Sequence, residues 1–180
     1  MSYYNMTFYV SSGFRDYPRS SAIGAVAACS MFAGGNLYWY TTAYLDRRGA
    51  IPTEQRAGIT AIVVALEWAL YEYDNRRSGN PPLRLTIYSD SEYVTRCMRQ
   101  NIAAWERNDC VHSDGRAIYD LDLWRYIAYL NRRVRDLGPV YYMRISREEN
   151  IDAVPRCIEA LDRRESEEQR GHSQANDESF

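Results

Sequence analysis

The order of strand-like and helix-like segments is the feature that most constrains the fold of this 180-residue chain. Segments rich in β-branched and aromatic residues read as strands, and segments whose apolar residues recur at helical spacing read as helices. The expected strands are 6–12, 22–32, 37–45, 83–88 and 140–145, and the expected helices are 54–73, 91–100, 121–137 and 151–161. This order predicts one α/β domain around a mixed sheet, whose first three strands form an antiparallel meander.

Local signals place several ends of these segments. Thr53 is expected to cap the first helix, and Ser89 with Glu92 makes a capping-box pattern before the second. Gly138 and the proline after it are expected to end the helix over 121–137. Residues 101–118 show no clear periodicity and are expected to be irregular.

Charge is unevenly distributed along the chain. Residues 165–180 hold five acids and one arginine, a net charge of −4, which leaves +2 for residues 1–164 because the total is −2. The acidic segment is polar and aperiodic, so the expected organisation is one domain over 1–164 and a disordered acidic tail over 165–180. All 22 basic residues are arginines, a bias that fits phosphate contacts and genome composition equally well.

The cysteines and the N-terminal sequence bear on the compartment. The four cysteines lack the paired spacing of a zinc ribbon or a redox pair, which favours buried, neutral thiols in a reducing environment. Neither a secretory leader nor a stretch of about 20 apolar residues is recognisable, so no membrane partner is expected. We expect an intracellular protein, cytoplasmic or nuclear.

Several strings, met in order between residues 6 and 162, resemble the ribonuclease HI family. They are TEQRAGITAIVVALE at 53–67, IYSDSEYV at 87–94, the Ile102 to Trp105 spacing followed by Arg107-Asn108, and DLW at 122–124. The resemblance implies the RNase H-like fold: a mixed five-stranded sheet, made of a three-strand antiparallel meander plus two parallel strands, flanked by helices.

The resemblance also implies a catalytic site and shows how this chain departs from it. The family hydrolyses the RNA strand of an RNA–DNA hybrid with two magnesium ions held by four carboxylates, because clustered anionic oxygens must offset the repulsion between the cations. The four matching positions are Ser11, Gly58, Asp90 and Val154. Only Asp90 is a potential metal ligand, and it should not suffice alone. The expectation is therefore a catalytically inactive relative, without a cofactor.

The alternative is a divergent hybrid ribonuclease that uses Mg²⁺ or Mn²⁺ on relocated acids. The candidates for such a rebuilt site are Asp16, Glu54, Glu149 and Asp152. Glu54 lies one turn before Gly58, whereas Asp152 is directed away from Val154. Asp90 also has a structural interpretation as a cap of the second helix, and Gly58 as a point of close packing. The family's mobile histidine loop before the last helix has no histidine here, since His112 and His172 lie elsewhere.

The same resemblance implies a second role, the binding of nucleic acid. Gln55 matches a residue that contacts the hybrid's minor groove, but Glu54 stands where an asparagine would be. The candidate contacts are Gln55, Arg47, Arg48, Arg76, Arg77 and Trp105. The segment around Trp105 carries acids instead of the family's basic protrusion, so a protein partner or self-association is preferred to an RNA–DNA hybrid or double-stranded RNA. Sixteen tyrosines and four tryptophans add to that preference.

Overall fold

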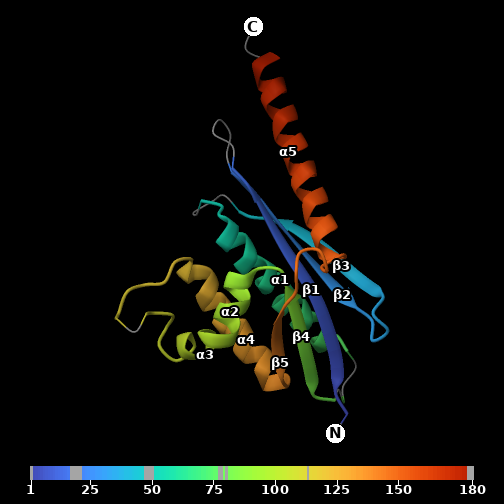
Figure 1. Cartoon of the computed structure of the whole chain (residues 1–180), viewed down its shortest axis with the longest axis vertical. Coiled ribbons are helices and arrows are strands. Elements are labelled where there is room, and N and C mark those ends of the chain that lie inside the picture. The colour runs from blue at the N-terminus through green and yellow to red at the C-terminus, as the bar shows by residue number, and fades with distance from the viewer. Residues whose placement is uncertain are drawn as a thin grey trace.

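The computed structural model describes residues 2–16, 22–46, 51–76, 79, 81–112 and 114–177, with side chains described up to residue 171. Its sheet has five strands in the order β3-β2-β1-β4-β5 (Figure 1). The strands are β1 (Tyr4–Arg15), β2 (Ile23–Met31), β3 (Leu37–Tyr44), β4 (Leu83–Ser89) and β5 (Val140–Arg144). β1 to β3 pair antiparallel, and β1 with β4 and β4 with β5 pair parallel. The expected mixed sheet is confirmed.

The helices follow the expected order, with one addition. They are α1 (Glu54–Asp74), α2 (Glu92–Gln100), α3 (Ile102–Trp105), α4 (Leu121–Leu137) and α5 (Ala153–Asp177). The short helix α3 lies inside the segment that was expected to be irregular. Thr53 caps α1 as expected, since its Oγ1 accepts a hydrogen bond from the Arg56 amide at 3.0 Å.

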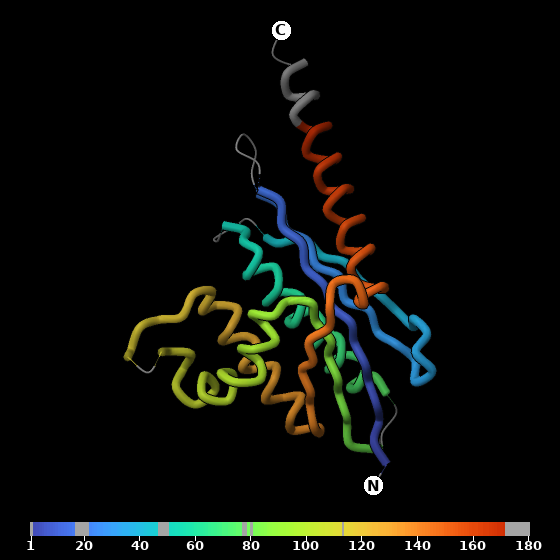
Figure 2. The backbone as a smooth tube through the Cα atoms, viewed as in Figure 1, coloured from blue at the N-terminus to red at the C-terminus, as the bar shows by residue number. Residues whose placement is uncertain are grey.

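The two faces of the sheet bury different helices because side chains alternate along each strand. Phe8 and Val10 of β1 pack into the main core, which includes Ile62 and Leu66 of α1. On the opposite face, a second core joins β2 to α5 through Ala27 and Cys157, among others. Figures 1 and 2 show α5 lying over the β1–β3 half of the sheet, while α2, α3 and α4 gather near β5. The four cysteines are buried and unpaired, as expected.

Gly138 ends α4 at a position that requires glycine. Its φ is +154°, and a Cβ there would lie 1.9 Å from the carbonyl oxygen of Leu83. No side chain fits such a close approach between the end of α4 and the start of β4. The end expected at Gly138 is therefore confirmed.

The last helix corrects the expectation of a disordered tail over 165–180. α5 continues to Asp177 without a break at residue 164, and residues 178–180 lie outside the described part. Ion pairs one turn apart support it, for example Arg164 with Glu168 at 3.1 Å, and Arg15 of β1 holds Glu165 at 2.5 Å. Apolar periodicity is missing beyond residue 164, but helix-forming residues there extend a helix that its packed first turns have nucleated.

Within the described residues, no helix is both long enough and apolar enough to cross a bilayer.

Candidate functional site

Ser11 and Asp90 meet where β4 ends and its parallel pairing with β1 stops. Val10 of β1 is in register with Ser89 of β4, which brings the following residues side by side. The Ser11 hydroxyl donates a hydrogen bond to Asp90 Oδ2 at 2.8 Å. By the resemblance, both residues stand at positions where the family has metal-binding carboxylates, and the structure brings them into direct contact.

Arg147 completes this cluster, and the sequence reasoning did not assign it a role. Its Nη1 lies 3.2 Å from the same Oδ2 atom of Asp90, whose side chain is only 5% exposed. Burial raises the pKa of Asp90 above its ordinary value, while the bond from Ser11 and the charge of Arg147 act in the opposite direction. The carboxylate therefore already has an internal counter-ion. The sequence held a signal for this role, because Arg147 is the basic residue in the short connection between β5 and α5, where the family has its histidine loop.

Gly58 lies where α1 packs against the start of α2. A Cβ at this position would lie 2.9 Å from Val94 Cγ2 and 3.0 Å from Ser91 Oγ. Ser91 is the N-cap of α2, and its hydroxyl accepts from the Val94 amide. The expectation of close packing is thus confirmed, and any side chain at residue 58 would crowd Val94 and Ser91 at the start of α2.

Val154 sits in the first turn of α5, next to a residue that ties this helix to the sheet. The buried Asn150 donates through Nδ2 to the Val10 carbonyl at 2.9 Å. Val154 follows one turn later, with its amide bonded to the Asn150 carbonyl. The aliphatic side chain of Val154 provides no oxygen ligand at this end of the sheet.

The acids of the alternative, rebuilt site have other partners or lie in solvent. Glu149 accepts from the Ser146 hydroxyl at 2.9 Å, and Asp152 lies 3.7 Å from Arg156. Asp16 and Glu54 are exposed. In the described part of the chain, no three or more His, Cys, Asp or Glu side chains form a group that could hold a metal ion. The residues present do not fit the paired divalent cations that the resemblance implies.

The capping role considered for Asp90 is wrong. Ser91, not Asp90 or Ser89, is the N-cap of α2, and Asp90 Oδ2 accepts from Ser11 and Arg147 instead. Ser89 has a supporting role, since its hydroxyl accepts from the Ser91 amide at 3.2 Å.

The three nucleic-acid candidates that the structure describes, Gln55, Arg76 and Trp105, do not share one surface. Gln55 is exposed at the start of α1, and the guanidinium of Arg76 lies 3.8 Å above the ring centroid of Tyr4. Arg47, Arg48 and Arg77 lie outside the described residues. The structure contradicts the expectation for Trp105, which is buried.

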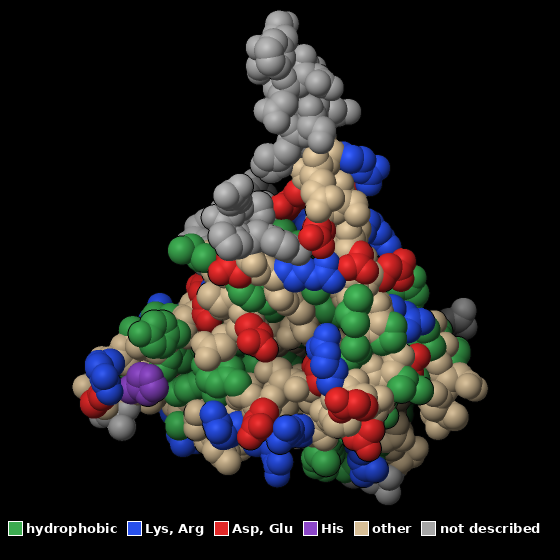
Figure 3. All heavy atoms as spheres, turned by 45° about the horizontal axis from the view of Figure 1, so that its top comes forward, with side chains coloured by type: hydrophobic (Ala, Val, Ile, Leu, Met, Phe, Trp, Pro, Cys, Tyr) green, Lys and Arg blue, Asp and Glu red, His purple; other side chains and the backbone are tan. Residues whose placement is uncertain are grey.

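Trp105 belongs to the core because it packs edge-to-face on Trp124, with ring centroids 4.9 Å apart. Acids near it are paired with arginines: Asp109 with Arg125 at 2.7 Å and Glu106 with Arg135 at 3.4 Å. At the start of α1, Arg56 is likewise held by Asp120 and Asp122. Figure 3 shows acidic and basic side chains interleaved over the face it displays, without a continuous basic surface.

This fold and these strand-end positions define the class of protein as RNase H-like. The family model described as RNase H matches residues 5–135, so the chain belongs to the RNase H family. A ribonuclease H of Moorella thermoacetica is 34% identical over 113 residues, which are 59% of this chain and 68% of that protein.

Solved structures agree on the fold. An RNase H1 isolated from compost superposes with a TM-score of 0.63 at 18% identity, covering 88% of this chain and 96% of that one. An RNase H1 in complex with an RNA/DNA hybrid gives a TM-score of 0.56 at 17% identity, covering 82% of this chain and 90% of that one.

Proposed function

We propose that this RNase H family member acts by binding and does not hydrolyse nucleic acid by a two-metal mechanism. The observation that carries the proposal is the Asp90 carboxylate, whose side chain is 5% exposed and paired with the Arg147 guanidinium at 3.2 Å. Two divalent ions carry four positive charges, whereas the Asp90 carboxylate offers a single negative charge. Without further anionic oxygens, the cations' mutual repulsion is not offset.

The other matching positions strengthen this argument. Ser11 offers a neutral hydroxyl that already donates to Asp90, and Gly58 lies against the α2 N-cap. Arg147 already neutralises the Asp90 oxygen that a metal ion would bind, and the described residues bring no group of three or more His, Cys, Asp or Glu side chains together there. The residues therefore support a site that is held together by its own internal ion pair.

A protein partner is the binding function that the surface supports best. Tyr38, Tyr40 and Tyr141 are each about half exposed, and tyrosine is enriched at protein interfaces. By contrast, Trp105 is buried, and the acids near it are paired with arginines. These observations favour contacts with protein over a basic, nucleic-acid-binding protrusion.

Binding of an RNA-containing duplex is the second candidate. Gln55 is exposed at the start of α1, and the RNase H1 named above was solved with an RNA/DNA hybrid. Glu54 beside it is exposed as well and would repel phosphates. Such binding would be weak and strongly dependent on salt.

The test is incubation of the full chain, at high concentration, with an end-labelled RNA–DNA hybrid in Mg²⁺ and in Mn²⁺. We expect no cleavage, while a ribonuclease H run in parallel cuts the same substrate. Cleavage that disappears in Asp90→Asn would overturn the proposal and establish the divergent nuclease. Mobility shifts with hybrid, double-stranded RNA and single strands, at low and high salt, separate the nucleic-acid binder from the protein binder.

A further inference from the structure

β5 is an edge strand with one side free. It pairs with β4 alone, at the end of the sheet. The Pro139 carbonyl accepts from the Leu85 amide, and the Ile145 amide donates to the Ser89 carbonyl, so both residues that flank β5 bond to β4. Because every second residue of a strand faces the same neighbour, Tyr141 and Met143 also direct their N–H and C=O groups to β4. Tyr142 and its alternate neighbours therefore direct their N–H and C=O groups outward. Among the described residues, no backbone or side-chain group bonds to them on that side.

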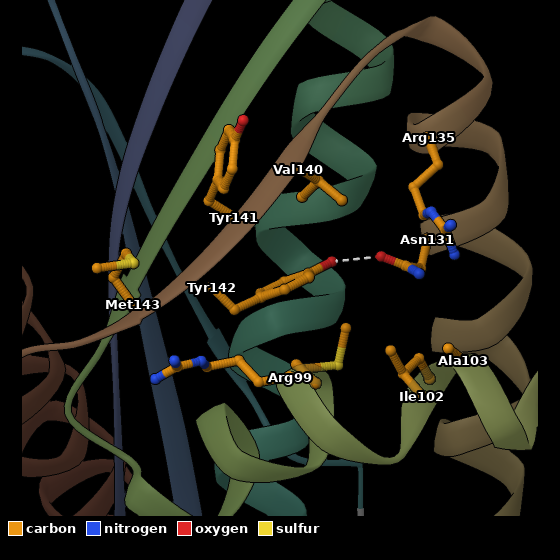
Figure 4. Close-up of a pocket in the computed structure, with 10 residues that line it drawn as sticks. Arg99, Ile102, Ala103, Asn131, Arg135, Val140, Tyr141, Tyr142 and Met143 are labelled. Atoms are coloured by element: carbon orange, nitrogen blue, oxygen red, sulfur yellow. Dashed lines mark hydrogen bonds between the residues drawn. The ribbon is translucent and has the colours of Figure 1, made fainter.

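A hollow of about 460 Å³ lies beside this free edge, between β5, α2, α3 and α4. Its apolar lining includes Met98, Ile102 and Val140, and Tyr142 extends across it toward Asn131 (Figure 4). An apolar recess next to unpaired strand groups is the arrangement that accepts an added strand, because the backbone provides pairing and the recess takes a side chain.

The wall of the hollow is held by a polar network whose inner members, Tyr142 and Asn131, are buried. The Tyr142 hydroxyl donates to Asn131 Oδ1 at 2.7 Å, and Asn131 Nδ2 donates to Glu106 Oε1 at 2.5 Å. Arg135 lies 3.4 Å from the other oxygen of Glu106. These bonds hold Tyr142 and Asn131 in the wall of the hollow without a ligand, which lowers the entropic cost of binding there.

The charges around the hollow indicate the chemistry of the occupant. Arg135, which is half exposed and shares its charge with Glu106, lies near the Val140 end of β5, and the guanidinium of Arg99 lies near the Met143 end (Figure 4). Arg99 is exposed and has no ion pair within the described part of the chain. A second copy paired through β5 would bring these arginines together, so charge complementarity favours a different, acidic partner.

We propose that β5 and this groove bind an extended peptide as a sixth strand, with an apolar side chain in the hollow and an acidic one toward each arginine. The inference rests on the protein-binding function proposed above and identifies the free edge of β5 and the adjacent hollow as the surface that carries it. Alternation along a strand then places the acidic, apolar and acidic residues at every second position of the peptide, all on the face toward the helices.

The experiment measures binding of a fluorescein-labelled peptide, Thr-Asp-Val-Leu-Val-Asp-Thr, to the full chain by fluorescence anisotropy. We expect saturable binding that weakens by about tenfold or more in Arg99→Glu and changes little in the control Arg163→Glu on α5. A peptide with lysines in place of both aspartates, and one with N-methyl groups on its edge-facing amides, should not bind. Equal binding of all three peptides would overturn the proposal.

Amide hydrogen exchange provides the second readout. Saturating peptide should protect the Tyr142 amide, which faces the free edge, because it gains a hydrogen bond in an added strand. Absence of binding, or binding without this protection, would overturn the groove proposal and leave the cleavage result untouched. Cleavage of the hybrid would overturn the non-catalytic function even if the peptide binds, so the two failures are distinguishable.

Discussion

Replacement of Arg147 by alanine would leave the Asp90 carboxylate without its counter-ion. Removing one partner of a fully buried pair costs about 3–5 kcal/mol, and removing one from an exposed pair costs about 0–1 kcal/mol. The side chain of Asp90 is 5% exposed and that of Arg147 is 49% exposed, which places this pair between the two cases. We therefore expect Arg147→Ala to lower the free energy of unfolding at neutral pH by about 2 kcal/mol.

The matched control is Arg125→Ala. Arg125 is 51% exposed, much like Arg147, but its partner Asp109 is 76% exposed. Urea denaturation of both variants and the parent chain should give a loss of less than about 1 kcal/mol for Arg125→Ala. If Arg147→Ala costs no more than Arg125→Ala, the reasoning about an internal counter-ion is refuted.

The stability deficit of Arg147→Ala should also depend on pH in a defined direction. The pKa of Asp90 is higher in the folded chain than in the unfolded chain. Protonation of Asp90 therefore contributes to the free energy of unfolding in full below the unfolded-state pKa, and this contribution is lost as the pH rises through the folded-state pKa. Removal of Arg147 raises that folded pKa further, because the bond and charge that oppose the burial effect are gone. The deficit of Arg147→Ala should therefore shrink as the pH is lowered from neutral toward about 4. A deficit that grows on acidification would contradict the account.

Three further outcomes follow from the packing. Gly58→Ala should lower the free energy of unfolding by about 1 kcal/mol, because crowding at the α2 N-cap outweighs the gain in helix propensity. Gly171→Ala, whose added methyl meets nothing within 4 Å, should instead raise the helix content seen by circular dichroism. In urea denaturation, Tyr142→Phe should cost about 1–3 kcal/mol by leaving a buried amide oxygen unpaired, whereas Tyr126→Phe at the surface should cost less than about 1 kcal/mol. Burial raises the pKa of Cys157 to about 12, so this thiol should react with a disulfide reagent only after unfolding.

Much of the fold could be predicted from the sequence because its signals are local. The helix over 121–137 was predicted with both ends correct, since Gly138 meets the backbone of β4 and allows no side chain. Thr53 indicated the start of α1 for a similar reason, because an N-cap side chain bonds to a backbone amide only three residues later. The end of α5 was missed because its continuation depends on charge pairs along the helix and with β1.

The candidate site was only half predictable. The missing carboxylates at Ser11, Gly58 and Val154 were visible by resemblance, but the Arg147 contact joins residues 57 positions apart and appears only when the strand ends converge. Trp105 was misplaced for a related reason. Its burial depends on Trp124, a partner that sequence spacing does not reveal.

The central claim is that too few anionic oxygens surround Asp90 to hold paired divalent ions. The most direct test is a crystal structure soaked in millimolar Mn²⁺, with anomalous diffraction used to locate the metal. The account predicts that the Arg147 guanidinium remains on the Asp90 carboxylate and that no manganese peak lies beside it. Two ordered manganese ions at Asp90, with Arg147 displaced, would contradict the account.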